Sequence, residues 1–110
     1  MTAAVDLDTI LAALADPHRR RVVDLLRIEP RRAGDLAEAI GLSPPAMSRH
    51  LKALRGCGLI EESHPAFDAR VRVYALRPEP MAHLKAWLEE TERLWSLQLA
   101  AFKAHLEGGA

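Results

Sequence analysis

The sequence lacks the features that mark several other classes of protein. It has one cysteine, Cys57, so neither an internal disulfide nor a pair of thiolate metal ligands can form within the chain. No apolar run is long enough to cross a bilayer, and residues 1–8 carry acids without the basic residues that begin a secretory leader. Phosphate-binding glycine loops, nucleophile elbows and metal-ligand clusters are also missing. We therefore expect a cytoplasmic protein that is not an enzyme and that has no cofactor or metal site.

The charge is zero overall but unevenly distributed along the chain. Of the 110 residues, 49% are hydrophobic, which is enough for the core of a single domain spanning residues 1–110. Residues 17–77 hold 12 Lys and Arg against 7 Asp and Glu, whereas residues 78–110 hold 3 against 5. A basic centre between acidic ends fits a domain that binds a polyanion, although an excess of this size also occurs on ordinary surfaces.

Four helices are expected before the periodicity of the sequence changes. Apolar residues recur at spacings of three and four over residues 7–15, 17–27, 33–40 and 43–55. Asp6, Asp16 and Ser43 are N-cap residues at three of these starts, and Gly41 ends the third helix. Because a residue before proline avoids helical angles, the regular part of the fourth helix is expected to begin only at Pro45.

The pattern after these helices is that of a hairpin followed by one long helix. Residues 59–62 and 71–76 have the composition of paired strands. The loop between them, residues 64–70, is too long for a tight turn and is expected to project as a flexible tip. After Pro80, neither glycine nor proline interrupts a helix to residue 106. The fold class is therefore mainly α with a β-hairpin.

This order of elements predicts a winged helix-turn-helix. The third and fourth helices flank a tight glycine turn, and the second helix of such a motif fits the major groove of DNA. The hairpin would be the wing, whose basic side chains meet phosphate or the adjoining minor groove. The candidate DNA-binding residues lie on the outward or flanking positions of the fourth helix and on the wing: Ser43, Pro45, Ala46, Ser48, Arg49, His50, Lys52, Arg55, Arg70 and Arg72.

These candidates differ in the role that their chemistry favours. Arg49 is the first choice for base recognition, because an arginine can donate two hydrogen bonds to guanine. Ser43, Ser48 and Lys52 are better suited to phosphates, and Ser43 can serve as an N-cap as well. His50 is as easily an inward-facing residue as a DNA contact, since histidine has an intermediate preference for burial.

The last helix predicts a homodimer. At about 1.5 Å per residue it is roughly 40 Å long, which is longer than the diameter of a domain of this size. We expect two apolar flanks on it, one for the core of its own chain and one for a second copy, with tryptophans as interface anchors. A two-fold dimer would place two recognition helices one DNA turn apart on a pseudo-palindromic operator. The candidate interface residues are Leu7, Ile10, Leu11, Leu84, Trp87, Leu88, Leu94, Trp95, Leu99 and Phe102.

Several segments resemble the ArsR family of bacterial repressors. The resemblance covers roughly residues 7–90 and is carried by residues 12–20, 36–43, 48–54, 58–60 and 72–76, of which Ser-Arg-His-Leu followed by Gly-Leu-Ile is fairly specific. It implies a dimeric repressor that pairs through its first and last helices and leaves its double-stranded DNA operator when an effector binds. Repression of its own operon is one expectation.

The chain departs from the metal-sensing members of that family. Where those proteins have a cysteine pair in the third helix, this sequence has Asp35, Leu36, Ala37 and Glu38, which offer no thiolate. The candidate ligands on the last helix, His83, Glu89, Glu90, Glu92 and His105, do not match the zinc-type spacing. We therefore expect a non-metal-sensing type. A metal-responsive repressor, an activator and a winged helix that only binds proteins remain alternatives, and the effector, operator and regulated genes are open.

Overall fold

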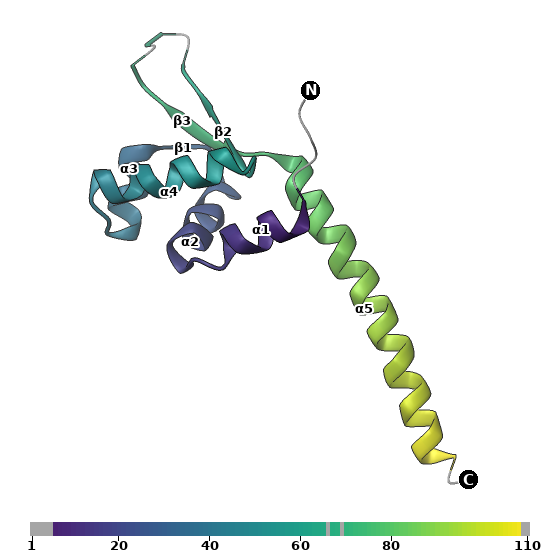
Figure 1. Ribbon diagram of the computed structural model, residues 1–110. Helices are drawn as coiled ribbons and strands as arrows, with labels where there is room; N and C mark the ends of the chain where they lie inside the picture. The colour runs from purple at the N-terminus through teal and green to yellow at the C-terminus, as the bar shows by residue number, and fades with distance from the viewer. Residues whose placement is uncertain (1–5, 66, 69, 109–110) are drawn as a thin grey trace.

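The chain forms a compact head of short helices and strands from which one long helix projects (Figure 1). The computed structural model describes residues 6–65, 67–68 and 70–108. In chain order, the elements are α1 (Leu7–Leu14), α2 (Pro17–Leu26), β1 (Arg31–Arg32), α3 (Ala33–Ile40), α4 (Pro44–Gly56), β2 (Ile60–Ser63), β3 (Val73–Leu76) and α5 (Pro78–Glu107). The winged helix-turn-helix expected from the sequence is confirmed. The expectation that the chain does not start with a secretory leader concerns residues that include 1–5, which lie outside the described residues.

The starts of the helices follow the capping chemistry of the sequence. The Asp6 carboxylate accepts a hydrogen bond from the Thr9 amide at 2.8 Å, and Asp16 accepts bonds from the amides of His18 and Arg19 at 2.8 and 3.1 Å. Gly41 adopts the left-handed conformation, with φ of 81°, that ends α3 and turns the chain toward α4. These two caps and this turn agree with the sequence-based prediction.

The recognition helix α4 begins one residue earlier than predicted. Ser43 has an extended backbone and its hydroxyl accepts the Ala46 amide at 3.3 Å, so Pro44 becomes the first helical residue. Two prolines fit there because the first N–H groups of a helix have no intrahelical acceptor. The missing N–H groups of Pro44 and Pro45 therefore cost no hydrogen bond. The expectation that the helix starts only at Pro45 was therefore wrong.

The sheet has three antiparallel strands in the order β1-β3-β2. The hairpin pairs Ile60 with Leu76 and Ser63 with Val73, so each strand is shorter than or shifted from its predicted range. Strand β1 was not expected from the sequence, because two residues are too few to show a period of two. The predicted flexible tip includes residues 66 and 69, which lie outside the described residues.

One hydrophobic core joins all the elements of the head. Residues of α1 to α4 and the hairpin contribute to it, and the first turns of α5 pack against it through Met81 and Leu84. The buried residues are Ile10, Ala13, Val22, Leu26, Leu36, Ala37, Ile40, Met47, Leu51, Leu54, Leu59, Ile60 and Tyr74. Among the described residues, no helix is sufficiently long and apolar to span a membrane.

Most of α5 lies outside this core. The molecule measures 71 × 35 × 21 Å and has a radius of gyration of 19.2 Å, against about 13 Å for a compact domain of this length. It exposes 7857 Å², against about 6,100 Å² for a compact monomer of its mass. The projecting helix accounts for the difference in shape, because every described residue after Leu84 is exposed.

The apolar residues of α5 form one main stripe, and Trp87 and Leu94, which are 42 and 48% exposed, lie seven residues apart on a second row beside it. Leu84, Leu88, Trp95 and Phe102 follow at spacings of four and seven residues, which return to the same face of a helix. Leu84 packs on the core, whereas Leu88, Trp95 and Phe102 are 51, 61 and 60% exposed. The face that α5 uses to join its own head therefore continues, uncovered, along the rest of the helix.

Candidate nucleic-acid interface

The helix α4 has one buried face and one exposed face. Met47, Leu51 and Leu54 are 0–2% exposed and fix the helix to the core. Ser48, Arg49, Lys52 and Arg55 are exposed on its other sides. A core contact at every third or fourth residue thus holds the helix rigidly and leaves its polar residues in solvent.

A hollow of about 300 Å³ lies where α4 meets the hairpin. Its wall combines the polar side of α4 with residues of the wing: Ser48, Arg49, Leu51, Lys52, Arg55, Glu62, Arg72 and Tyr74. Five of the ten candidate DNA-binding residues therefore line one concave surface, although they come from two parts of the chain. We call this surface the α4–wing surface.

Glu62 of β2 lies at the centre of the α4–wing surface, and the sequence analysis did not single it out. Its side chain is 14% exposed and accepts hydrogen bonds from the Arg55 guanidinium and, at 2.9 Å, from the Tyr74 hydroxyl. The Arg72 Nε lies 3.9 Å from its other oxygen. A single carboxylate therefore orients both arginines. The contact of Glu62 with Tyr74 could have been found from the register of the hairpin, which places these two residues opposite each other.

The environment of Glu62 keeps it charged. Partial burial raises its pKa, but the Tyr74 hydrogen bond and the charges of Arg55 and Arg72 outweigh burial and hold the pKa of Glu62 below its ordinary value of 4.5. Burial and the neighbouring Glu62 carboxylate raise the pKa of Tyr74 above 10.0, so its hydroxyl remains a donor. The carboxylate also cancels part of the positive charge of this surface.

The wing carries two arginines in different settings. The Arg70 side chain is 92% exposed, and its Nε lies 3.3 Å from the Asp68 carboxylate. The Arg72 side chain is 63% exposed and belongs to the α4–wing surface through Glu62. Both guanidinium groups are accessible, and their ion pairs are exposed enough to be exchanged for another anion.

Three other candidates lie at the start of α4. Ser43 and Pro45 are exposed, Ala46 is half-buried, and Ser43 is occupied as the N-cap. His50 does not join them or the α4–wing surface. It is half-buried on the side of α4 that faces α2, and its ring centroid lies 5.5 Å from that of His18. This position beside His18 favours the inward one of the two roles left open for His50.

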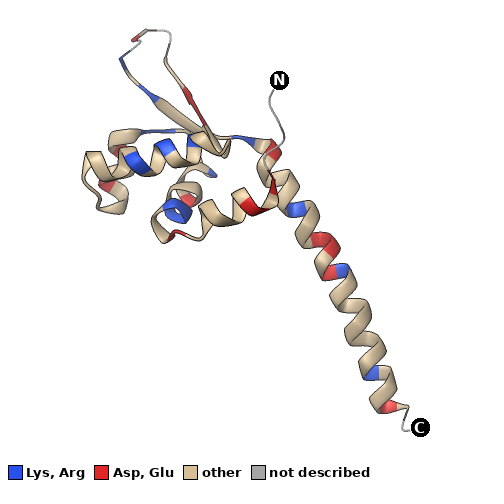
Figure 2. Ribbon diagram, viewed as in Figure 1, with Lys and Arg blue, Asp and Glu red and all other residues tan. Residues whose placement is uncertain are grey.

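The Lys and Arg of the head lie mainly on α2, on α4 and on the sheet beside α4. Figure 2 shows them along α4, on the sheet beside it and also on α2, whereas α1 carries acids and α5 carries both signs. Several charges of α5 form their own pairs, such as Lys85 with Glu89 at 3.8 Å and Arg93 with Glu90 at 2.8 Å. The uneven charge seen in the sequence therefore places several basic residues along α4 and the wing, and others on α2.

Comparison with known proteins identifies the family. A sequence profile of bacterial regulatory proteins of the arsR family matches residues 16–62, which include α2, α3, α4 and the start of β2. The chain is 36% identical over 95 residues to the HTH-type transcriptional regulator Rv2034 of Mycobacterium tuberculosis, and the match covers 86% of this chain and 83% of that protein. The chain belongs to the ArsR family. It is a DNA-binding transcription regulator, and such regulators are not enzymes.

Two further relatives of this ArsR protein bear on fold and function. The transcriptional repressor SdpR of Bacillus subtilis is 36% identical over 56 residues, covering 51% of this chain and 62% of that protein. An ArsR-like transcriptional regulator from Rhodococcus sp. RHA1 superposes with a TM-score of 0.74 at 28% identity, covering 93% of this chain and 91% of that one. The latter match extends over most of the chain and confirms the winged helix-turn-helix architecture.

Proposed function

We propose that two copies of this ArsR protein, paired through α5, repress transcription from a pseudo-palindromic operator, including that of their own gene. The observation that carries this proposal is the rigid α4, whose apolar side is buried and whose Ser48, Arg49 and Lys52 are exposed beside the wing. Repression is supported by the similarity to a protein named as a transcriptional repressor. The alternative, a winged helix that binds only proteins, does not account for the four basic residues of the α4–wing surface, Arg49, Lys52, Arg55 and Arg72.

The exposed side chains of α4 favour different contacts with DNA, some with bases and some with phosphates. Arg49 would donate two hydrogen bonds to a guanine in the major groove. Ser48 and Lys52 flank it and would bind phosphates, and the Ser43 hydroxyl, which accepts the Ala46 amide, can still donate its proton to a phosphate oxygen. Pro45 and Ala46, which carry no charge, would contact the DNA backbone or the edges of the bases. We leave His50 out because it faces α2.

The wing would hold the adjoining backbone or minor groove. Arg70 and Arg72 are exposed, and a phosphate can replace the carboxylates of Asp68 and Glu62 with which they pair. Arg55 is hydrogen-bonded to Glu62, so its role is to brace the wing against α4 as well as to add positive charge. Glu62 thereby sets the angle between helix and wing.

The proposed dimer rests on the uncovered apolar stripe of α5. Its charged residues lie mostly on the opposite side and pair among themselves, which leaves the stripe for a second copy in a symmetric contact. Leu7 and Leu11 of α1 would add to this interface, while Leu84 would add only the part not packed on its own core. Ile10 is 0% exposed, so we remove it from the interface. The remaining proposed contacts are Trp87, Leu88, Leu94, Trp95, Leu99 and Phe102.

We further propose that the input to this regulator is not a thiophilic metal at α3. Leu36 and Ala37 of α3 are buried in the core, and the exposed residues between its ends are Asp35, Glu38 and others without sulfur. The carboxylates and histidines of α5 do not form a group of three ligands among the described residues. Another effector, or the concentration of the repressor itself, would then set occupancy of the operator.

The test is binding to DNA from upstream of the gene at several salt concentrations. We expect the logarithm of the affinity to fall linearly with the logarithm of salt, because phosphate contacts release counterions. Arg49→Ala removes a bidentate base contact of about 1–3 kcal/mol from each of the two half-sites, so it should weaken operator binding by at least about 30-fold without lowering the melting temperature. Arg93→Ala removes the same charge on the polar side of α5 and serves as the matched control. Unchanged affinity of Arg49→Ala, or binding that ignores salt, would contradict the proposal.

A further inference from the structure

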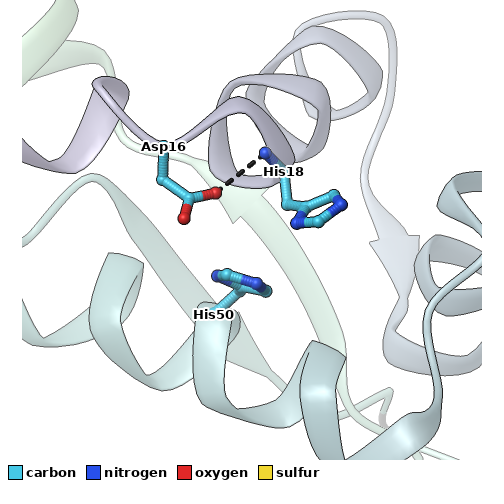
Figure 3. Close-up of side chains that lie close together, drawn as sticks. All are labelled: Asp16, His18 and His50. Atoms are coloured by element: carbon cyan, nitrogen blue, oxygen red, sulfur yellow. Dashed lines mark hydrogen bonds between the residues drawn. The ribbon is translucent and has the colours of Figure 1, made fainter.

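Three potential metal ligands from distant parts of the chain meet between α2 and α4. Asp16 precedes α2, His18 lies in its first turn, and His50 lies on α4. One ligand atom from each lies within 4.8 Å of the other two. Figure 3 shows the Asp16 carboxylate and both imidazole rings turned toward the same space. The sequence analysis found no metal-ligand cluster because two of these residues are separated from the third by all of α3.

The ligand atoms of this cluster are available. The Asp16 Oδ1 accepts the amides of His18 and Arg19, which leaves Oδ2 for another partner. Neither the His18 nor the His50 ring makes a hydrogen bond to any described residue, although their centroids are 5.5 Å apart with planes at 54°. Two imidazoles with unused ring nitrogens and one carboxylate oxygen thus converge on one point.

We propose that Asp16, His18 and His50 bind a divalent transition metal ion of the zinc type. Imidazole and carboxylate ligands in a two-to-one ratio are a common set for such an ion, with a solvent molecule as the fourth ligand. Bonds of about 2.0–2.2 Å place tetrahedral ligand atoms about 3.3 Å apart. From 4.8 Å, the side chains need to close by roughly 1.5 Å, which rotation about their χ angles can supply without movement of the helices.

One neighbouring charge opposes the ion. The Arg19 guanidinium lies 3.9 Å from the Asp16 Oδ2, with a side chain 27% exposed. It must turn toward solvent when the carboxylate coordinates metal, and the half-exposed position of the pair permits this. The ion replaces one long ion pair of 3.9 Å with three coordinate bonds, so the exchange favours the metal.

The site would fasten the recognition helix to the rest of the head. His50 follows Arg49 directly, and Asp16 and His18 belong to the start of α2, so the ion would bridge the two helices. It uses neither α3 nor α5, and among the described residues no other group of three such ligands comes together. The proposal does not depend on DNA binding and is tested without DNA.

Cobalt and zinc titrations of the tag-free protein test the site directly. We expect one Co²⁺ per chain, with visible absorption bands of the coordinated ion that Zn²⁺ abolishes by displacement. His18→Gln and His50→Gln should each weaken binding at least 100-fold. His105→Gln, near the exposed end of α5, is the matched control and should bind as the unaltered protein does. No Co²⁺ binding up to about 1 mM, or loss of binding only in His105→Gln, would overturn the proposal.

A third variant separates metal binding from folding. Asp16→Asn retains a good N-cap for α2 but loses the negatively charged oxygen ligand. We expect it to fold with a melting temperature close to that of the unaltered protein without metal, and to bind Co²⁺ at least 10-fold more weakly. Zn²⁺ should raise the melting temperature of the unaltered protein and not that of His18→Gln. Equal thermal shifts in both would show that the ion binds elsewhere.

Discussion

Truncation of Trp95 to alanine should separate the proposed dimer without unfolding the head. Trp95 is 61% exposed on the stripe of α5 and takes no part in the core. Its removal leaves α1 to α4 and the hairpin untouched, because α5 joins the head through Met81 and Leu84. The effect therefore falls on association alone.

The size of the effect follows from the area that Trp95 still exposes. A tryptophan buries up to about 250 Å², so the 61% that is exposed leaves roughly 150 Å² for a partner to cover. At about 25 cal/mol per Å², full burial contributes up to about 4 kcal/mol in each copy. Alanine keeps the Cβ atom, and an interface covers a side chain only in part. We therefore count about half of the full burial energy, or about 2 kcal/mol, for each of the two copies. A loss of about 4 kcal/mol raises the dimer dissociation constant by roughly 1000-fold.

Sedimentation equilibrium over a range of concentrations measures this constant. We expect a dimer for the unaltered chain at micromolar concentration and a monomer for Trp95→Ala, with the same helical circular dichroism for the head. Ser96→Ala, the neighbouring residue on the charged side of α5, should remain a dimer and is the matched control. A monomeric unaltered chain, or equal dissociation constants for Trp95→Ala and Ser96→Ala, would refute the reasoning.

Two further predictions concern the wing. Arg72→Ala should weaken binding to operator and unrelated DNA alike and reduce the slope of log affinity against log salt by about 1, which fluorescence anisotropy at four salt concentrations measures. A loss confined to the operator would instead make Arg72 a base contact. Because the pKa of Glu62 is lowered in the fold, its charged form stabilises the protein above its unfolded pKa near 4.5, and this contribution is lost as pH falls through the folded value. Thermal melts should therefore show Glu62→Gln less stable than the unaltered protein at pH 7 and increasingly similar to it below pH 4.5; a constant difference would contradict this.

The parts of the fold that depend on local chemistry could be predicted from the sequence. The N-caps Asp6 and Asp16 and the left-handed Gly41 act through hydrogen bonds and backbone angles within three or four residues, so their spacing is visible in the chain. The buried face of α4 follows from the three-and-four spacing of Met47, Leu51 and Leu54. The exposed face that carries Arg49 could be inferred from these contacts.

The parts that depend on tertiary contact could not be predicted in the same way. Glu62 orients Arg55 and Arg72 only because the hairpin folds back on α4, and nothing near it in sequence indicates that contact. The meeting of His18 with His50 likewise needs the packing of α2 on α4. Ile10 was assigned to the interface from its apolar spacing, but the same spacing serves the core, and it is fully buried there.

A footprint of the protein on the DNA upstream of its gene tests the central claim most directly. If two chains joined by α5 each present α4 to the major groove, hydroxyl radicals should leave two protected stretches on one face of the duplex, centred about 10 base pairs apart. The protection should require higher concentrations of Arg49→Ala and of Trp95→Ala than of the unaltered protein, in line with the losses predicted above. A single protected stretch that persists in Trp95→Ala, or no protection at a concentration where the chain is dimeric, would contradict the account.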